Sequence, residues 1–390
     1  MRVLVAPDCF TGTLSAGEAA AAMAEGWRRT APGDRVRELP LSDGGPGFVD
    51  ALQSALGGER VPVVVEDPRG RPAPAEVLLV PSAAPGAPLT AYVESAQACG
   101  SHHLAGDGPS AGALDPAALS TVGVARLVAA GVAAGAGRVV VGLGGSATTD
   151  GGAGLLAGLG AQPADELRRG LPVAPVDLDL RPARAALAGV DLVVASDVDA
   201  PLLGPQGAVL GFGPQKGVPR ADLAGLEARM SAWAESVEAA RVSGAAGRPG
   251  APCHRAPGAG AAGGLGLALL ALGAARVPGA QEVADAVGLA EAARSSDLVV
   301  TGEGAFDWQS LRGKVVTAVA RAAQAAAVPV VVVAGQVLVG RRELSSAGVD
   351  AAYAVAEDPS QVSAALADPR GTLAARVARV AATWSRPPVA

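Results

Sequence analysis

A glycine-rich stretch that also carries hydroxyl groups is the part of this sequence best suited to binding phosphate. Residues 139–154 read VVVGLGGSATTDGGAG, an apolar run followed by a loop that opens a helix. Amide N–H groups in such a loop and at a helix N-terminus attract phosphate oxygens, and glycines let the backbone approach closely. Asp150 is expected to bind magnesium or a substrate hydroxyl, with a tight capped turn as the alternative. We expect phosphate contacts from Gly144, Gly145, Ser146 and Thr148.

The lysines of this chain are unusually few. Lys216 and Lys314 are the only two, and the sequence has no isoleucine and no asparagine. We infer a GC-rich coding sequence in which arginine has replaced lysine wherever the chemistry permits. Lysine is a compact point charge on a flexible stem, whereas arginine is a broad planar fork. Each remaining lysine stands beside a glycine in a loop, so we predict that both contact phosphate; a solvated lysine is the alternative.

Carboxylates follow several strand-like runs of this sequence. Ligands of parallel α/β sheets bind beyond the carboxyl ends of the strands, so these carboxylates are expected to serve one ligand-binding region. We predict Asp197 as the catalytic base, with Asp43 as the second candidate. Turn formation and helix capping are the alternative roles. Contacts to the substrate are predicted for Asp8, Glu303 and Asp307.

A second glycine-rich stretch, residues 257–266, reads PGAGAAGGLG. It predicts another helix start that binds an anion of the cofactor through Gly260 and Gly263, although close packing through small residues is equally compatible. Residues 142–147 fit the dinucleotide fingerprint, which alone is weak evidence for a nicotinamide-dependent oxidoreductase. A complete Walker phosphate loop is missing from the sequence.

Strand-like runs alternate with helical patterns along most of the chain, which predicts an α/β fold with parallel sheets. We expect residues 1–60 together with 290–390 to form a Rossmann-like parallel-sheet domain. Residues 61–289 are expected to form a second α/β domain inserted into the first. Residues 15–18, Ser-Ala-Gly-Glu, are a capping-box pattern and predict the start of the first helix.

Composition excludes several classes of function. The chain has 390 residues, half of them apolar, and a net charge of −6, which gives no basic surface for nucleic acid. No apolar run is long enough to span a bilayer, and the first eight residues do not resemble a signal peptide. The three cysteines, Cys9, Cys99 and Cys253, are scattered, as is typical of a cytoplasmic protein with reduced thiols. A small-molecule substrate is expected, and a homodimer is compatible with the sequence.

Several motifs together resemble the bacterial type I glycerate kinase family. They are Ala6-Pro7-Asp8-Cys9-Phe10, SDGG at 42–45, GLGGSAT at 142–148 and FGPQKG at 212–217. The resemblance extends over most of the chain, from residue 3 to about 353. It implies a Rossmann-like domain with a second α/β domain inserted. It also implies transfer of the γ-phosphoryl group of ATP to a hydroxyl of glycerate, with magnesium, usually giving 2-phosphoglycerate.

The sequence departs from this family's pattern at five positions. Many members carry Lys in place of Thr11, Glu in place of Pro46 and Arg in place of Ala305, and Asn is frequent where this chain has Thr149 and Ala200. Loss of the two basic groups would weaken binding of a carboxylate or phosphate. The alternatives are therefore a metabolite-binding regulator with impaired catalysis, or a kinase for a related small hydroxy acid.

Overall fold

The computed structural model of this chain describes residues 1–82, 86–104, 115–243 and 251–385. The chain divides into two compact units. Unit 1 contains residues 1–43, 50–57 and 279–390, and unit 2 contains residues 44–49 and 58–278. Both units are built on sheets dominated by parallel pairs, with helices packed against them, so the predicted α/β fold class is confirmed. That the chain forms two domains with boundaries after residues 60 and 289 stays a prediction.

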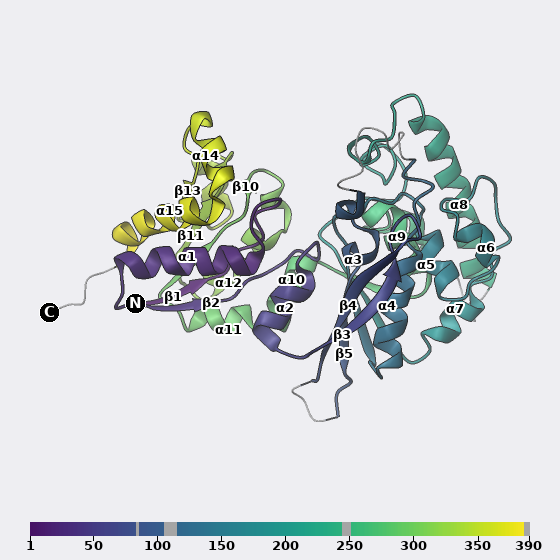
Figure 1. Ribbon diagram of the computed structural model, residues 1–390, viewed down its shortest axis with the longest axis horizontal. Helices are drawn as coiled ribbons and strands as arrows, with labels where there is room; N and C mark the ends of the chain where they lie inside the picture. The colour runs from purple at the N-terminus through teal and green to yellow at the C-terminus, as the bar shows by residue number, and fades with distance from the viewer. Residues whose placement is uncertain (83–85, 105–114, 244–250, 386–390) are drawn as a thin grey trace. The chain divides into compact units, whose positions relative to one another are not determined.

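Unit 1 is built on a five-stranded, entirely parallel sheet with the strand order β13-β11-β9-β1-β2 (Figure 1). Counted within the unit, this is the doubly wound order 2-1-3-4-5, in which ligands bind where the order reverses, between the first and third strands. Those two strands are β1 and β9. The bounds are β1 Arg2–Val5, β2 Arg35–Glu38, β9 Leu298–Thr301, β11 Val330–Ala334 and β13 Ala351–Ala354.

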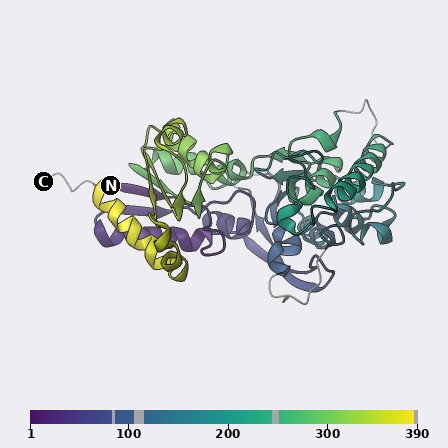
Figure 2. The same ribbon diagram turned by 90° about the horizontal axis from the view of Figure 1, so that it is seen from above.

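Helices cover both faces of this sheet. Helices α1 (Ala16–Thr30) and α15 (Pro369–Trp384) lie side by side, purple and yellow in Figure 2. Trp27 of α1 is completely buried in the same core as the strand residues Val3 and Val333. Helices α11 and α12 pack against each other on the opposite side. The predicted capping box at the start of α1 is confirmed, because Ser15 and Glu18 each bond the other's backbone N–H.

The remaining elements of unit 1 are short. A two-stranded parallel ladder, β10 with β12, follows the carboxyl ends of β9 and β11. The bounds are α10 Gly279–Ala286, α11 Leu289–Arg294, β10 Ala305–Phe306, α12 Val315–Ala325, β12 Gln336–Val337, α13 Arg341–Ser346 and α14 Val362–Ala367, with 3₁₀ turns at Ser310–Arg312 and Pro359–Gln361. Helix α2, Phe48–Leu56, contributes residues to both units.

Unit 2 contains a six-stranded sheet in the order β3-β4-β5-β6-β7-β8. The β3–β4 and β4–β5 pairs are antiparallel, and the pairs from β5 to β8 are parallel. In the ladder Gly142, the last residue of β6, lies opposite Glu94 on one side and Ala195 on the other. Three parallel strands therefore end at one level, and the loops that follow them begin at the same edge of the sheet.

The strands of unit 2 are β3 Glu59–Glu66, β4 Pro72–Val80, β5 Thr90–Glu94, β6 Arg138–Gly142, β7 Asp191–Ala195 and β8 Ala275–Val277. Its helices are α3 Ala96–Cys99, α4 Val122–Ala133, α5 Ala153–Gly158, α6 Ala164–Leu167, α7 Arg181–Ala186, α8 Leu223–Ser243 and α9 Ala261–Ala271. Three 3₁₀ turns are at Ser101–Leu104, Pro214–Lys216 and Cys253–Arg255. None of the helices in the described part of the chain is both long and apolar enough to cross a bilayer.

Candidate active site

Phosphate-binding potential in unit 2 is concentrated in the glycine-rich loop, residues 142–149, which follows β6. The N–H groups of Gly144, Gly145 and Ser146 donate to no acceptor among the described residues. Gly145 has a positive φ of 63°, which favours glycine, and a side chain there would meet the ring of Pro46. Successive N–H groups of residues that alternate between right-handed and left-handed backbone conformations form concave anion-binding sites. These three N–H groups are therefore suited to bind phosphate oxygens.

Lys216 is bonded directly to this loop. Its Nζ donates to Ser146 Oγ at 2.9 Å and to the Thr148 carbonyl at 2.7 Å. Burial lowers the pKa of Lys216 to about 8, since the ammonium group is taken out of water. The ammonium therefore lies at the glycine-rich loop, and its predicted contact with phosphate stays a prediction. The structure brings together Ser146, Thr148 and Lys216, which are up to 70 residues apart in the chain.

Two threonine hydroxyls of the same loop are buried without a partner. Thr148 Oγ1 and Thr149 Oγ1 have no hydrogen-bond partner among the described residues, and both side chains are fully buried. An unsatisfied buried hydroxyl is costly unless a ligand or water completes it. The loop therefore has spare hydrogen-bonding capacity beside Lys216, which is what a polar ligand requires.

Asp150 organises the end of this loop. Its Oδ2 accepts hydrogen bonds from the Thr121 N–H and Oγ1 and from the Gly154 N–H, and its Oδ1 accepts from the Gly152 N–H. The carboxylate is fully buried, and burial raises its pKa against the effect of these bonds. A magnesium-binding role for Asp150 stays a prediction that these contacts do not favour. The first amides of α5, expected to face phosphate, are instead bonded to Asp150 and to Thr121 Oγ1.

The second glycine-rich stretch supports the loop by close packing. Ala262, Gly263 and Gly264 have φ values of 51°, 69° and 91°, so the start of α9 is left-handed and not a regular helix N-terminus. A Cβ atom on Gly263 would lie 1.9 Å from the Thr148 carbonyl oxygen, and one on Gly260 would lie 2.2 Å from that of Pro201. This geometry agrees with the packing alternative. Nucleotide binding by Gly260 and Gly263 stays a prediction.

Asp197 follows β7 and is half-buried at the same edge of the unit 2 sheet. Its chain neighbourhood is held by Arg276, which donates to the Ser196 carbonyl at 2.8 Å and pairs with Asp199 at 2.6 Å. The position agrees with the prediction of a carboxylate at a strand end. Its role as a base stays a prediction.

Glu94 was not singled out from the sequence. It ends β5, is buried, and its Oε2 accepts from the N–H groups of Gly47 at 3.1 Å and Val49 at 3.3 Å. It thereby holds residues 44–49 against the ends of β6 and β7, where a Cβ on Gly44 would lie 2.7 Å from the Ala195 carbonyl oxygen. The signal was available, because Glu94 follows an apolar run just as Asp8 does.

Unit 1 carries a cluster of carboxylates at the point where its strand order reverses. The acidic cluster, Asp8, Asp43 and Glu303, comes from the segments that follow β1, β2 and β9. Lys314, at the start of α12, lies with its Nζ 3.8 Å from Asp43 Oδ2. Three acids and one lysine therefore share a region in which Asp8 and Glu303 are each only 8 % exposed. The structure thus brings together four residues that the sequence predicted to act on the ligand.

Burial and mutual repulsion change the proton affinity of these acids. Burial, followed by the charge of Asp43, raises the pKa of Asp8 well above its usual range. Burial raises the pKa of Glu303 to about 7, opposed by Ser310 and Lys314. Burial and the charge of Asp8 raise the pKa of the neighbouring Cys9 thiol to about 12, so this thiol is a poor nucleophile.

Asp307 has a structural role in the turn that precedes Lys314. Its Oδ1 accepts from the N–H groups of Gln309 at 2.8 Å and Ser310 at 3.3 Å, which shapes the turn before Lys314. The side chain is half-buried, and its charge helps raise the pKa of Glu303. A direct substrate contact for Asp307 stays a prediction.

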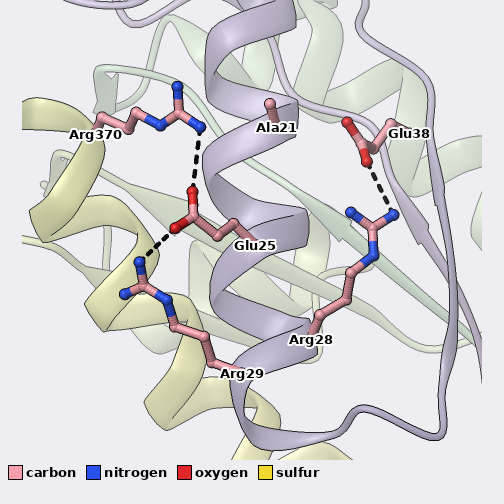
Figure 3. Close-up of a pocket in the computed structure, with 6 residues that line it drawn as sticks. All are labelled: Ala21, Glu25, Arg28, Arg29, Glu38 and Arg370. Carbon is pink, nitrogen blue, oxygen red and sulfur yellow. Dashed lines mark hydrogen bonds and ion pairs between the residues drawn. The ribbon is translucent and has the colours of Figure 1, made fainter.

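A surface pocket of unit 1 has a different character. It has a volume of about 600 Å³ and is lined by charged side chains from α1, β2 and the start of α15 (Figure 3). Arg28 pairs with Glu38 at 3.0 Å, while Glu25 pairs with both Arg29 and Arg370. Because these charges are paired with one another at the surface, the pocket offers weaker ligand chemistry than the acidic cluster.

The described side chains do not form a metal cage of their own. Within residues 1–82, 86–104, 115–243 and 251–385, no group of three or more His, Cys, Asp or Glu side chains is arranged to hold a metal ion. Magnesium in phosphoryl-transfer enzymes usually takes one or two carboxylates and completes its shell with phosphate oxygens and water. A dedicated protein cage for magnesium is therefore not expected here.

We predict that Asp150→Asn destabilises unit 2. The amide NH₂ of Asn cannot accept the hydrogen bonds that one carboxylate oxygen now accepts, which costs about 3 kcal/mol. Thermal unfolding should therefore shift down by several degrees. Asp177→Asn, an exposed change in the same unit, is the control and should leave the midpoint unchanged. An unchanged midpoint with weaker magnesium-dependent nucleotide binding would show that Asp150 acts as a metal ligand instead.

We also predict that Glu303→Gln removes a pH dependence of stability. The folded-state pKa of Glu303, about 7, lies above the ordinary value of 4.5. Native protein therefore binds more protons than unfolded protein between these values, and stability falls as the pH rises through this window. Relative to wild type, Glu303→Gln should gain about 2 kcal/mol in free energy of unfolding between pH 5 and pH 8, measured by urea denaturation. The exposed Glu291→Gln should show no such gain, and a flat difference for Glu303→Gln would refute the assignment.

Comparison with known proteins places the chain in a family. The family model described as "Glycerate kinase family" matches residues 3–385. A glycerate kinase of Bacillus subtilis is 37 % identical over 364 residues, covering 91 % of this chain and 90 % of the relative. A glycerate 2-kinase of Escherichia coli is 34 % identical over 362 residues, with 91 % and 90 % coverage.

A solved structure agrees with this relationship. The crystal structure from Salmonella typhimurium LT2, described as a glycerate kinase 2, superposes with a TM-score of 0.77 at 32 % identity. The match covers 98 % of this chain and 98 % of that one. It extends over both units, so the α/β architecture described above is shared along the whole length. The chain is an enzyme that belongs to the glycerate kinase family.

Proposed function

We propose that this protein transfers the γ-phosphoryl group of ATP to a hydroxyl group of glycerate. The observation that carries the proposal is the attachment of Lys216 to a loop with three amides that have no acceptor among the described residues. Phosphoryl transfer depends mainly on positioning and on stabilising negative charge, and this loop offers both kinds of group. The names of the relatives, glycerate kinase and glycerate 2-kinase, supply the expected acceptor.

The hydrogen-bond donors of unit 2 are suited to bind the phosphate groups of the nucleotide. Gly144, Gly145 and Ser146 supply amides, Lys216 supplies a positive charge, and the hydroxyl of Thr148 is buried without a partner among the described residues. Negative phosphate oxygens would also favour the charged form of Lys216, whose pKa is lowered by burial to about 8. Binding of phosphate and protonation of Lys216 are therefore expected to strengthen each other.

The acidic cluster and Lys314 of unit 1 are suited to bind glycerate. Its hydroxyl groups can donate hydrogen bonds to Asp8 and Glu303, and both acids are buried at the reversal of strand order. Lys314, whose Nζ lies 3.8 Å from Asp43 Oδ2, could offset the charge of the substrate carboxylate or of the transferred group. The Lys–Asp43 pair also keeps this cluster from being uniformly negative.

One carboxylate has to accept the proton of the reacting hydroxyl. The sequence favours Asp197, with Asp43 as the second candidate, and both follow parallel strands. Magnesium is expected to arrive with ATP and to neutralise charge on the phosphates when bound. Because Asp150 is buried and hydrogen-bonded by four donors, no residue of the chain is assigned to the metal.

The remaining expectations follow from the sequence and the relatives. The product is proposed to be 2-phosphoglycerate, as the name of the Escherichia coli relative suggests for that protein. Cys9, Cys99 and Cys253 are free thiols, in keeping with a cytoplasmic location. A homodimer stays a prediction.

The proposal predicts glycerate-dependent release of ADP from ATP and magnesium by the purified protein. The reaction should be followed with a coupled ADP assay, and the phosphorylated product should be resolved by ³¹P NMR. Formation of 2-phosphoglycerate supports the full proposal, and 3-phosphoglycerate would correct the choice of hydroxyl. Binding of ATP and glycerate without turnover would support a metabolite-binding regulator, and turnover of another small hydroxy acid alone would correct the substrate.

A further inference from the structure

We propose that Glu303 accepts the proton of the hydroxyl group that is phosphorylated. The inference rests on the proposed kinase function, and it gives Glu303 a role in the reaction itself. The sequence predicts substrate binding for this residue and favours Asp197, then Asp43, for proton transfer.

The surroundings of Glu303 leave one carboxylate oxygen available. Glu303 follows β9 and is 92 % buried, as its exposed fraction of 8 % shows. Its Oε1 atom is the one buried carboxylate oxygen in the described part of unit 1 that has no hydrogen-bond partner. A buried acceptor without a donor is costly, so this atom is suited to a hydroxyl that arrives with a ligand.

The position of Glu303 in the fold agrees with this role. Strands β1 and β9 flank the reversal of strand order, where doubly wound sheets bind their ligands. The N–H of Asp8 donates to the Gly302 carbonyl at 2.9 Å, which ties the two strand ends together. On the other side, the N–H of Gly335 donates to the Glu303 carbonyl at 3.1 Å. The backbone of Glu303 is therefore fixed from both neighbouring strands.

The other acids of the cluster are less suited to accept a proton. Asp8 already accepts a hydrogen bond from the Cys9 N–H at 2.7 Å, and burial raises its pKa well above the usual range. Asp43 lies with its Oδ2 3.8 Å from the Lys314 Nζ, so one of its carboxylate oxygens is already paired with a cation. Ser310 and Lys314 also act on Glu303, but its Oε1 atom is buried without a hydrogen-bond partner among the described residues.

The surroundings of Glu303 bring its pKa close to neutral pH. Burial raises its pKa to about 7, and the charges of Asp307 and Asp43 add to this effect, whereas Ser310 and Lys314 oppose it. A general base works best when its pKa lies near the working pH. The polar and charged groups that act on the cluster come from the segments after β1, β2, β9 and β10 and from the start of α12: Asp8, Cys9, Asp43, Asp307, Ser310 and Lys314.

The proposed step balances without a further reactant. The O–H bond of the acceptor hydroxyl breaks and its proton passes to Glu303 Oε1. The hydroxyl oxygen forms a bond to the γ-phosphorus of the nucleoside triphosphate, and the bond from that phosphorus to the β–γ bridging oxygen breaks. The electron pair of the broken bond leaves with the diphosphate, and Glu303 afterwards releases its proton to water.

The kinetic test compares Glu303→Gln with Glu291→Gln, an exposed surface change in the same unit. Glu303→Gln should lower kcat at least 100-fold, the range that general-base catalysis supplies, and change the Kd for glycerate less than threefold. Wild-type kcat should rise with pH along an acidic limb near pH 7, and Glu291→Gln should keep both rate and limb. A Glu303→Gln rate within threefold of wild type would overturn the proposal. So would a tenfold weaker Kd with unchanged kcat, because Glu303 would then only bind substrate.

Two further variants separate proton transfer from folding and from the rival base. Glu303→Asp keeps a carboxylate, so this variant should fold, have a lower kcat and retain the acidic limb of the pH–rate profile. Asp197→Asn should retain the acidic limb of the pH–rate profile near pH 7, whatever the value of its kcat. Loss of the limb in Asp197→Asn, with the limb kept in Glu303→Gln, would transfer the role to Asp197 and overturn the proposal.

An infrared titration tests Glu303 without any substrate. The wild-type protein should show a buried carboxylic C=O band that disappears as the pH rises through about 7, and Glu303→Gln should lack this band. The same titration in both proteins would overturn the proposal even for an active kinase. If wild type shows the band but does not phosphorylate glycerate, the proposed substrate fails. The rate comparison is then made with other small hydroxy acids, where a loss in Glu303→Gln supports the role and an unchanged rate refutes it.

Discussion

Desolvation of acids at the carboxyl ends of parallel strands is the constraint on which the candidate site depends. Strands β1, β2 and β9 run in the same direction, so the segments that follow them meet at one edge of the sheet. Three carboxylates and one lysine are gathered there, and two of the acids are almost completely buried. Such a cluster needs protons or ligand donors to offset its charge, and this need links the fold of unit 1 to its proposed chemistry.

Unit 2 provides the opposite kind of surroundings at an equivalent edge. The ends of β5, β6 and β7 are level, and the loop after β6 offers amides, hydroxyls and the Lys216 ammonium. Asp150 is the exception, because its negative charge is completely buried and held by four donors. We propose that the donors that remain contact a ligand, while Asp150 stabilises the loop that carries them.

Much of this arrangement could be predicted from residue types and spacing. Rules about strand ends identified Asp8, Asp43 and Glu303, and the scarcity of lysine identified Lys216 and Lys314. Long-range contacts could not be predicted in this way. That Asp150 bonds to Thr121 and not to a ligand depends on packing between α4 and α5, which no local pattern encodes. The left-handed turn at Ala262–Gly264 was likewise not predictable, because it depends on the close approach of Gly263 to the Thr148 carbonyl and of Gly264 to Gly151.

The central claim is that nucleotide phosphates depend on the donors of unit 2 and not on the acidic cluster of unit 1. Calorimetric titration of ADP into Lys216→Met and Asp43→Asn tests it most directly. Lys216→Met removes the ammonium that bonds Ser146 and Thr148, so the account predicts at least tenfold weaker ADP binding. Asp43→Asn should bind ADP within threefold of wild type. Strong loss of ADP binding in Asp43→Asn, with normal binding in Lys216→Met, would contradict the account.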